Sequence, residues 1–152
     1  MAIIYKQGNI FREEVMALVN PVNTVGVMGK GLALQFKKLY PHNFQLYREA
    51  YKAYQLEVGK MLVTEIEGLK NPKYIVNFPT KEHWRSKSKM SYIEEGIEDL
   101  ARFILSSEIS SIALPALGCG LGGLDWEEVR LVIEERLGGI AGKTGVIVFE
   151  PK

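Results

Sequence analysis

Short apolar runs alternate with longer segments in which apolar residues recur at helical spacing. Apolar runs rich in β-branched residues predict strands, and apolar positions three or four residues apart predict helices with one buried face. Strands are expected over residues 3–7, 15–19, 61–66, 74–78, 111–114 and 145–149. Helices are expected over residues 32–39, 44–54, 91–104 and 125–137.

The same periodicity predicts which helical side chains face the core. Ser91 with Glu94, and Asp125 with Glu128, have the spacing of capping boxes, so they are expected to begin the last two helices. The expected inward faces are Leu32, Phe36 and Leu39; Phe44, Tyr47, Ala50, Tyr51 and Tyr54; Ile93, Ile97, Leu100, Ala101 and Ile104; and Trp126, Val129, Ile133 and Leu137.

The order of elements, ββααββαβαβ, predicts an α/β protein with a mixed sheet and helices on both faces. Residues 15–19 are continuously apolar, so this strand is expected at the centre of the sheet, buried on both sides. Ligands of such sheets bind at the carboxyl ends of the strands. The connections that follow the strands are therefore where binding residues are expected.

A glycine-rich segment lies between the strand at 111–114 and the helix beginning at Asp125. Four of the six residues 118–123 are glycine. Glycine lets the backbone approach a ligand closely, and backbone N–H groups at a helix N-terminus bind anions, above all phosphate. A tight strand–helix turn without a ligand is the alternative, but four glycines in this position favour phosphate binding.

Two better-known glycine motifs fit the chain poorly. Gly118, Gly120 and Gly123 match G-x-G-x-x-G, but a dinucleotide fold places that motif in its first βαβ unit, and here it lies in the last third. Residues 26–31 resemble a P-loop, yet Lys30 is followed by glycine where that motif needs Ser or Thr. Neither a Rossmann dehydrogenase nor a nucleoside triphosphatase is expected.

The composition of the chain limits the classes of protein to which it can belong. A chain of 152 residues is expected to form one domain over 1–152, and a net charge of +1 offers no global argument for nucleic-acid binding. We find no membrane-span pattern and no signal-peptide pattern, and a single cysteine suits a reducing, cytoplasmic protein. One cysteine and two distant histidines leave too few ligands for a Cys/His zinc site. No metal and no cofactor are expected.

Polar residues follow two of the predicted strands. Asn20 and Asn23 end the second strand and lead into the glycines at 26–31, so their amides either hold the loop or bind a ligand. The segment from Thr80 to Lys89 is basic and contains an aromatic residue. Both segments are candidates for ligand contact.

Several stretches together resemble the macrodomain family, the ADP-ribose-binding fold. They are Gly-Asn-Ile at 8–10, Ala-Leu-Val-Asn-Pro-Val-Asn at 17–23, the first glycine loop, and Leu-Gly-Cys-Gly-Leu-Gly-Gly at 117–123. The resemblance covers essentially the whole chain and implies a three-layer α/β/α sandwich with a mixed, mostly parallel sheet. Within that family, residues 20–31, 77–87 and 117–126 are similar to the DarG type.

DarG proteins are antitoxins of DarT–DarG systems, in which DarT ADP-ribosylates thymidine in single-stranded DNA and the DarG macrodomain removes the mark. The resemblance therefore implies an ADP-ribosyl glycohydrolase, a hydrolase acting on ADP-ribosylated single-stranded DNA. It implies ADP-ribose as ligand and the DarT toxin as a partner, and we expect a monomer. A non-catalytic ADP-ribose reader is one alternative. A hydrolase of carboxylate-linked ADP-ribose or of ADP-ribose-1″-phosphate is another.

The resemblance also implies roles for individual residues. Asn9 would meet the adenine amino group, Asn23 would bind the distal ribose, and Asn20 would brace the first loop. Phe149 would lie against the adenine, and the second glycine loop would wrap the diphosphate. The full set of expected ADP-ribose contacts is Gly8, Asn9, Ile10, Asn20, Asn23, Gly29, Gly31, Gly118, Cys119, Gly120, Leu121, Gly122, Gly123 and Phe149.

Lys81 is the expected catalytic residue. In the related human macrodomain that cleaves ADP-ribose from carboxylates, a lysine after the corresponding strand attacks the distal ribose, whereas its catalytic aspartate corresponds to Gly122 here. Asp125 lies three residues later and is expected to be an N-cap, which argues against a Lys/Asp pair. Lys81 is then either a nucleophile or a cation that positions the substrate. Cys119 has no histidine partner and is not expected to be a nucleophile.

The basic segment is the expected contact with DNA. Lys81 and three further cations are placed to meet phosphates, and His83 or Trp84 to stack on a base. A solvated loop with Trp84 packed inward is the alternative. The DNA-contact candidates are His83, Trp84, Arg85, Lys87 and Lys89.

Overall fold

The computed structural model describes residues 3–151 and contains the strands and helices in the expected order. The strands are β1 (Ile4–Lys6), β2 (Ala17–Asn23), β3 (Leu62–Glu65), β4 (Tyr74–Lys81), β5 (Ser111–Leu114) and β6 (Gly145–Phe149). The helices are α1 (Gly31–Leu39), α2 (Pro41–Lys52), α3 (Met90–Ser107) and α4 (Trp126–Leu137), with a short 3-10 helix, η1 (Ile10–Arg12).

The strands form one six-stranded sheet in the order β1-β6-β5-β2-β4-β3. β3 runs antiparallel to β4, and the other neighbouring pairs are parallel. The sheet is therefore mixed and mostly parallel, as the resemblance implied. The carboxyl ends of β6, β5, β2 and β4 consequently lie side by side along one edge.

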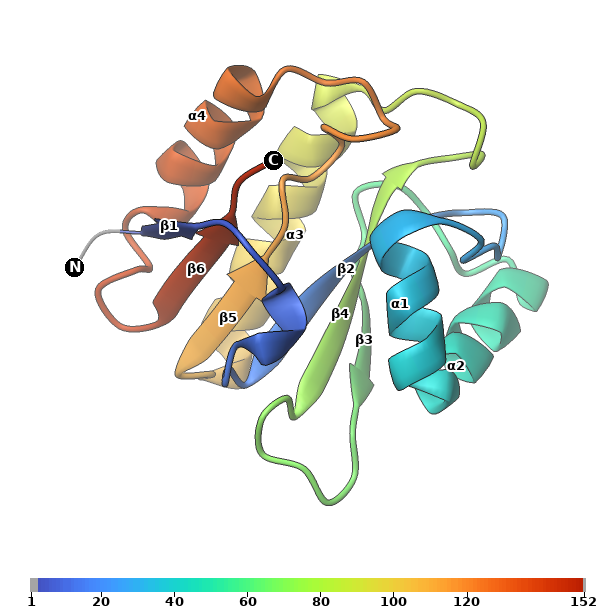
Figure 1. Cartoon of the computed structure of the whole chain (residues 1–152), viewed down its shortest axis with the longest axis horizontal. Helices are drawn as coiled ribbons and strands as arrows, with labels where there is room; N and C mark the ends of the chain where they lie inside the picture. Colours follow the sequence, from blue (N-terminus) through green and yellow to red (C-terminus); the bar gives the residue numbers. More distant parts are fainter. Residues whose placement is uncertain (1–2, 152) are drawn as a thin grey trace.

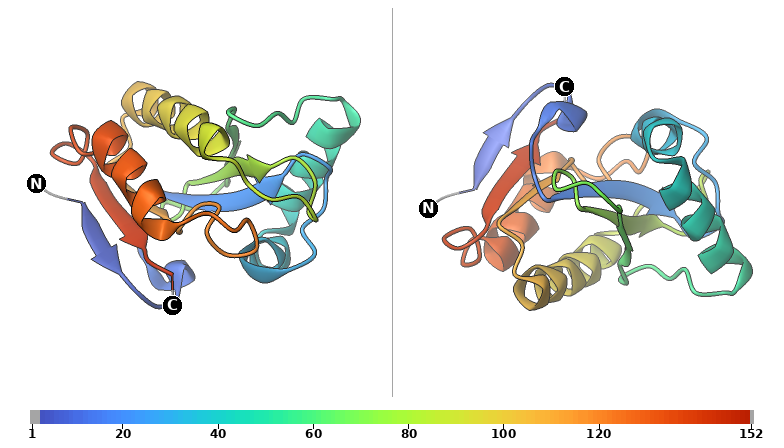
Figure 2. Two further views of the ribbon diagram at one scale, coloured as in Figure 1. Left: turned by 90° about the horizontal axis from the view of Figure 1, so that it is seen from above. Right: turned by 90° about the horizontal axis from the view of Figure 1, so that it is seen from below.

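Helices cover both faces of this sheet. α3 and α4 pack on one face, whereas α1 and η1 lie on the other, with α2 beside α1 near β3 (Figures 1 and 2). Val19 of β2 belongs to the core cluster under α3 and α4, and its neighbour Leu18 belongs to the cluster under η1 and α1. Successive strand residues point to opposite faces, so the continuous apolar run at 15–19 reflects a strand buried on both sides.

Two strands extend further toward the site than expected. β2 continues through Pro21 to Asn23, and β4 continues beyond Phe78 to Lys81. Each strand gives the other a pairing partner, with Asn20 opposite Asn77 and Asn23 opposite Lys81. Mutual pairing thus outweighs the weak strand propensity of Asn and Pro. Lys81 is the last residue of a strand, not a loop residue.

The caps of the last two helices also differ from expectation. α3 begins at Met90 with Lys89 as its N-cap, so the expected capping box from Ser91 to Glu94 is not formed. Asp125 does occupy the N-cap position of α4, but its side chain makes no capping hydrogen bond.

Three predicted core residues are exposed. Leu39, Tyr51 and Tyr54 are 56%, 37% and 96% exposed, whereas Phe36 and Tyr47 are fully buried. α1 and α2 cover the end of the sheet, where there is room to bury only one narrow side of each helix. α2 ends at Lys52, which leaves Tyr54 beyond the helix with a positive φ of 58°.

Between Ile3 and Pro151, the structure contains no helix whose length and apolar character would suit a passage across a bilayer.

Candidate functional site

A cavity of about 760 Å³ opens at the carboxyl ends of β2, β4 and β5. Three segments far apart in sequence enclose it: the end of β2 with the first glycine loop, the end of β4 with the basic loop, and the residues after β5. The lining residues are Pro21, Val22, Asn23, Val27, Gly29, Lys30, Gly31, Leu32, Ala33, Thr80, Lys81, Trp84, Arg85, Pro115, Ala116, Gly118, Gly120, Leu121 and Gly122. Both glycine loops and the expected catalytic lysine therefore meet at one cavity.

Asn23 lies in the wall of this cavity beside Lys81, its register partner on β4. Its Oδ1 accepts hydrogen bonds from the Val25 and Val27 backbone N–H groups, at 3.1 and 3.3 Å. Its Nδ2 donates one hydrogen to the Val27 carbonyl oxygen at 2.8 Å. An amide has two such hydrogens, so Asn23 both holds the first loop and keeps one donor for a ligand.

Asn20 does not line the cavity. It is fully buried, and its Nδ2 donates to Asn77 Oδ1 across the β2–β4 pair at 3.1 Å. Asn77 in turn exchanges hydrogen bonds with Asn43 of α2, at 2.8 and 3.1 Å. These buried amides tie α2 and both strands together behind the cavity, an arrangement that fits the bracing role expected of Asn20.

Lys81 projects from the last position of β4 into the cavity wall. Its Nζ donates a hydrogen bond to the Trp84 carbonyl oxygen at 3.0 Å. Partial burial lowers the pKa of Lys81 from its usual value, because desolvation disfavours the charged form. A lowered pKa raises the fraction of free amine, the form that a lysine nucleophile needs.

The second glycine loop is held against the basic loop by Ser88. The Ser88 backbone N–H donates to the Gly122 carbonyl oxygen at 3.0 Å. A β-carbon on Gly122 would lie 2.4 Å from Ser88 Oγ and 2.5 Å from the Gly118 carbonyl oxygen, so no other residue fits there without displacing the backbone. A β-carbon on Gly120, by contrast, would meet no atom within 4 Å.

Ser88 was missed by the sequence analysis. It is 6% exposed, and its hydroxyl has no hydrogen-bond partner among the described residues. Nothing in the pattern around a serine between two lysines distinguishes it from a solvated loop residue. Only its backbone hydrogen bond to Gly122 shows that Ser88 helps to hold the second glycine loop in place.

Cys119 lies inside the second glycine loop but does not line the cavity. Burial, followed by the negative charge of Asp125, raises the pKa of the thiol to about 11. The thiolate is the reactive form of cysteine, and it is scarce at neutral pH when the pKa is raised. The structure thus gives a physical reason to expect an inert thiol.

Cys119→Ala is accordingly expected to keep most of the glycohydrolase activity and of the ADP-ribose affinity that the sequence predicts. Steady-state kinetics and calorimetry on the variant test this. A loss of activity above roughly a hundredfold, the scale for removal of a reacting group, would instead make Cys119 a participant.

The residues expected around the adenine gather elsewhere, beside the end of β6. Ile10 and Phe149 pack in one cluster, and Phe149 is only 7% exposed. Asn9 is exposed, and its Oδ1 accepts from the Phe11 N–H at 3.0 Å, which caps η1. Gly8 precedes it with a φ of 124°. This group lies outside the cavity, although β6 is the direct neighbour of β5.

Part of the basic loop faces the cavity. Trp84 and Arg85 line it, and Trp84 is 39% exposed, so the indole is not packed inward. The His83 ring lies 5.0 Å from the Trp84 ring, and the Arg85 guanidinium lies 4.5 Å from it. Lys87 instead approaches the second glycine loop, with its Nζ 3.4 Å from a β-carbon placed on Gly123. Lys89 Nζ lies over the Tyr92 ring at 5.6 Å.

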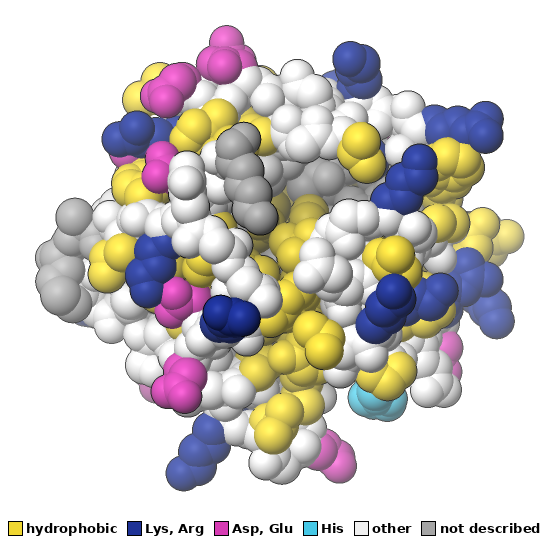
Figure 3. All heavy atoms as spheres, viewed as in Figure 1, with side chains coloured by type: hydrophobic (Ala, Val, Ile, Leu, Met, Phe, Trp, Pro, Cys, Tyr) yellow, Lys and Arg dark blue, Asp and Glu magenta, His cyan; other side chains and the backbone are white. Residues whose placement is uncertain are grey.

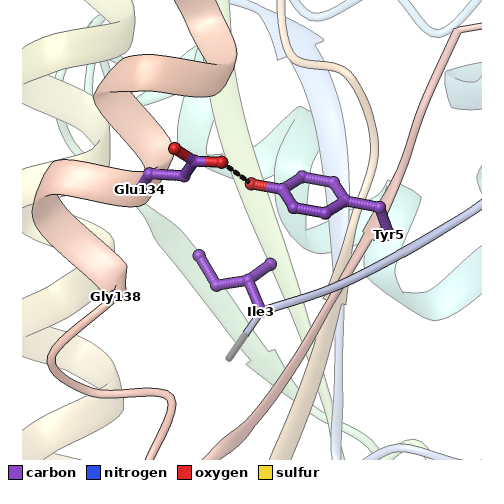
Figure 4. A pocket seen from close by; sticks show the side chains of 4 residues that line it. All are labelled: Ile3, Tyr5, Glu134 and Gly138. Atoms are coloured by element: carbon purple, nitrogen blue, oxygen red, sulfur yellow. Dashed lines mark hydrogen bonds between the residues drawn. The ribbon is translucent and has the colours of Figure 1, made fainter. Parts of the chain in front are cut away.

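A smaller cavity of about 220 Å³ lies at the other end of the strands, lined by Ile3, Tyr5, Glu134 and Gly138 (Figure 4). Tyr5 Oη donates to Glu134 Oε1 at 2.7 Å, and Arg130 Nε donates to the same oxygen at 3.1 Å. Burial and the Glu134 carboxylate raise the pKa of Tyr5 to about 12. The polar groups of this cavity form hydrogen bonds with one another, and the bond from Tyr5 to Glu134 links β1 to α4. We therefore assign no reactive group to this cavity.

Across residues 3–151, no group of three or more His, Cys, Asp or Glu side chains is placed to hold a metal ion.

The six-stranded mixed sheet, with two glycine loops facing one cavity, is the arrangement of a macrodomain. Residues 19–133 match the family model for the Macro domain, and the chain belongs to this family. Within it, the chain is of the DarG type. It is 45% identical to the macrodomain of Mycobacterium tuberculosis DarG, with a TM-score of 0.95 over 99% of this chain and 98% of that one.

Two further relatives are longer than this chain. A Thermus aquaticus protein named DNA ADP-ribosyl glycohydrolase is 50% identical over 147 residues, 97% of this chain and 41% of its own length. Thermosipho africanus DarTG, solved in complex with ADP-ribose, is 34% identical with a TM-score of 0.89 over 97% of this chain and 41% of that chain. The chain thus spans about two fifths of the length of these relatives.

Proposed function

We propose that the chain is an ADP-ribosyl glycohydrolase that removes ADP-ribose from thymidine in single-stranded DNA and so counteracts a DNA ADP-ribosyltransferase toxin. The observation that carries the proposal is the pairing of Asn23 with Lys81 in the cavity between the two glycine loops. The printed name of the T. aquaticus relative and the ADP-ribose complex of T. africanus DarTG support the same activity.

An extended ligand fits the row of strand ends. Neighbouring strands lie ~4.8 Å apart, so the row from β6 through β5 and β2 to β4 spans ~14 Å. Adenine would lie at the end of β6, near Asn9 and Phe149. The diphosphate would lie against the backbone of the second glycine loop, after β5. The distal ribose would then reach Asn23 and Lys81, at the ends of β2 and β4.

Lys81 carries the chemical step in this proposal. Its free amine attacks the anomeric carbon of the distal ribose, and the bond from that carbon to the thymine nitrogen breaks. Thymine leaves with the electron pair and takes up a proton, and water then releases ADP-ribose from the lysine. The lowered pKa of Lys81 and its place at the ribose end of the cavity support this role. Gly122 leaves no room for an aspartate partner, so Lys81 acts without one.

The decisive experiment offers the protein two substrates, DNA and a protein carboxylate, each carrying ADP-ribose, and follows release by mass spectrometry. Release from DNA alone is expected. Release from the carboxylate alone would favour the second hydrolase, and binding without release from either would make the domain an ADP-ribose reader.

The basic loop is expected to bind the DNA strand and not ADP-ribose. Replacing Arg85, Lys87 and Lys89 together by alanine should weaken binding of ADP-ribosylated oligonucleotide and flatten its salt dependence, because fewer counterions are released. Affinity for free ADP-ribose should hardly change. Titrations of both ligands at several salt concentrations test this, and equal losses on the two would place the loop over the ribose.

A further inference from the structure

The positive charge of this chain is concentrated in two segments. Residues 24–55 and 81–89 together hold nine Lys and Arg side chains and two Glu, whereas the rest of the chain holds ten basic and sixteen acidic residues. The near-zero net charge therefore combines +7 in these two segments, nine basic minus two acidic residues, with −6 in the rest of the chain, ten basic minus sixteen acidic residues. On the face drawn in Figure 3, the basic side chains gather over the region of α1, α2 and the loop after β4.

The basic residues of these segments are not neutralised by neighbours. Within residues 3–151, none of the nine lies within 4.0 Å of a carboxylate oxygen, whereas six of the nine described basic residues elsewhere do. Even the cations that are held in place are held by neutral groups. Arg48 donates to the Gly26 carbonyl oxygen at 3.0 Å, and Lys37 Nζ lies 4.6 Å from the Phe44 ring.

The two segments join at the mouth of the cavity. The Thr24 N–H and hydroxyl both donate to the Glu82 carbonyl oxygen, at 2.9 and 3.0 Å. Lys30 and Arg85, one from each segment, line the cavity. α1 leads away from this point, and its last turn carries the exposed Lys37 and Lys38.

The spacing along α1 suits a polynucleotide. Lys37 lies seven positions after Lys30, the N-cap of α1, which corresponds to about two helical turns and ~10 Å along the helix axis. A stacked strand advances ~3.4 Å per nucleotide, so this distance corresponds to roughly two to three nucleotides. A strand whose modified base enters the cavity would meet Lys30 first and the pair Lys37 and Lys38 two to three phosphates later.

We propose that α1 is a second DNA contact, distinct from the basic loop, which binds the phosphates on one side of the modified thymidine through Lys37 and Lys38. The inference rests on the proposed function and adds the direction in which the strand leaves the cavity. A modified substrate that ends close to the thymidine would not reach these residues. Their contribution should therefore appear only when the substrate extends beyond the thymidine.

The test compares Lys37→Glu/Lys38→Glu with the control Lys70→Glu/Lys143→Glu, which makes the same change in net charge at exposed lysines outside both segments. Two substrates are used. One is an ADP-ribosylated trinucleotide, and the other is an oligonucleotide with about six nucleotides on each side of the modified thymidine. Thermal melting and calorimetry with free ADP-ribose establish that each variant is folded and binds.

The α1 variant is expected to lose about tenfold in kcat/KM on the long substrate at low salt, with the loss shrinking as salt rises. Trimming nucleotides from one end of the long substrate, but not from the other, should remove the difference between variant and wild type. The trinucleotide and the control variant should show changes within about twofold.

Equal kcat/KM for the α1 variant and wild type on the long substrate, with normal turnover, would overturn the inference and leave the proposed function intact. A loss of the same size in the control variant, or on the trinucleotide, would also overturn it. If the wild-type protein turned over neither substrate, the proposed function would be rejected, and the proposed DNA contact on α1 would be rejected with it.

Discussion

Lys81→Ala is expected to lower the turnover of ADP-ribosylated DNA by at least about a thousandfold while leaving the affinity for free ADP-ribose within about twofold. The ligand-binding groups assigned above lie on Asn23 and on the backbones of the two glycine loops, so they survive the change. Single-turnover kinetics and calorimetry measure the two quantities separately. Lys70→Ala, which removes an exposed lysine far from the cavity, is the control.

Lys81→Arg decides how the lysine acts. Arginine keeps the positive charge but does not deprotonate at ordinary pH. If the amine attacks the sugar, the arginine variant should be as inactive as the alanine variant, and borohydride should trap a lysine–sugar adduct in the wild type. Appreciable turnover by the arginine variant, without an adduct, would show that Lys81 acts by its charge.

The pH dependence of kcat gives an independent test. A nucleophilic amine is active when deprotonated, so kcat should rise with pH until the pKa of Lys81 is passed. Desolvation lowers that pKa, which moves the rise toward neutral pH. A lysine that acts as a cation would give the opposite sign, with kcat falling as pH rises through the same pKa. Full activity of Lys81→Ala would reject both versions.

Gly120→Glu is expected to reduce the affinity for ADP-ribose by at least about a hundredfold, because a carboxylate would face the diphosphate across a few ångströms. A β-carbon at Gly120 meets no atom of the described residues within 4 Å, so the side chain enters open space and the fold is retained. Calorimetry on the folded variant measures the loss. Near-native affinity would show that the diphosphate of ADP-ribose does not bind at this loop.

Two alanine variants serve as matched controls. Gly120→Ala adds a methyl group to the same open space without charge and should bind ADP-ribose nearly as well as wild type. Gly122→Ala places its methyl group against the Gly118 carbonyl oxygen and Ser88 Oγ, so it should displace the loop and lower both the melting temperature and the affinity. Together, the two variants distinguish a loss of affinity caused by negative charge near the diphosphate from a loss caused by displacement of the loop.

The second glycine loop has no space at Gly122 for the side chain of an aspartate partner. The second glycine loop closes on Ser88 of the basic loop, and this contact occupies the space that a side chain at Gly122 would need. A backbone hydrogen bond thereby joins the basic loop to the second glycine loop. In the proposed function, the DNA contact and the ADP-ribose contact are positioned by the same serine.

Local patterns alone were enough to predict the order of strands and helices, the central position of the strand at 15–19 and the two glycine loops. The spacing of apolar residues and the position of glycines determine local structure within a few residues, so both can be interpreted without knowledge of the fold. The three long matches to DarG proteins likewise depend only on residue order, and the family followed from them.

Tertiary structure decided where the strands end and which side chains meet. β2 and β4 each extend to the cavity because they pair with one another, and the pairing that sets Asn23 beside Lys81 joins residues 58 positions apart. The burial of Asn20 and the contact of Ser88 with Gly122 have the same origin. Local propensity does not contain these features, because the free energy that fixes them comes from partners distant in sequence.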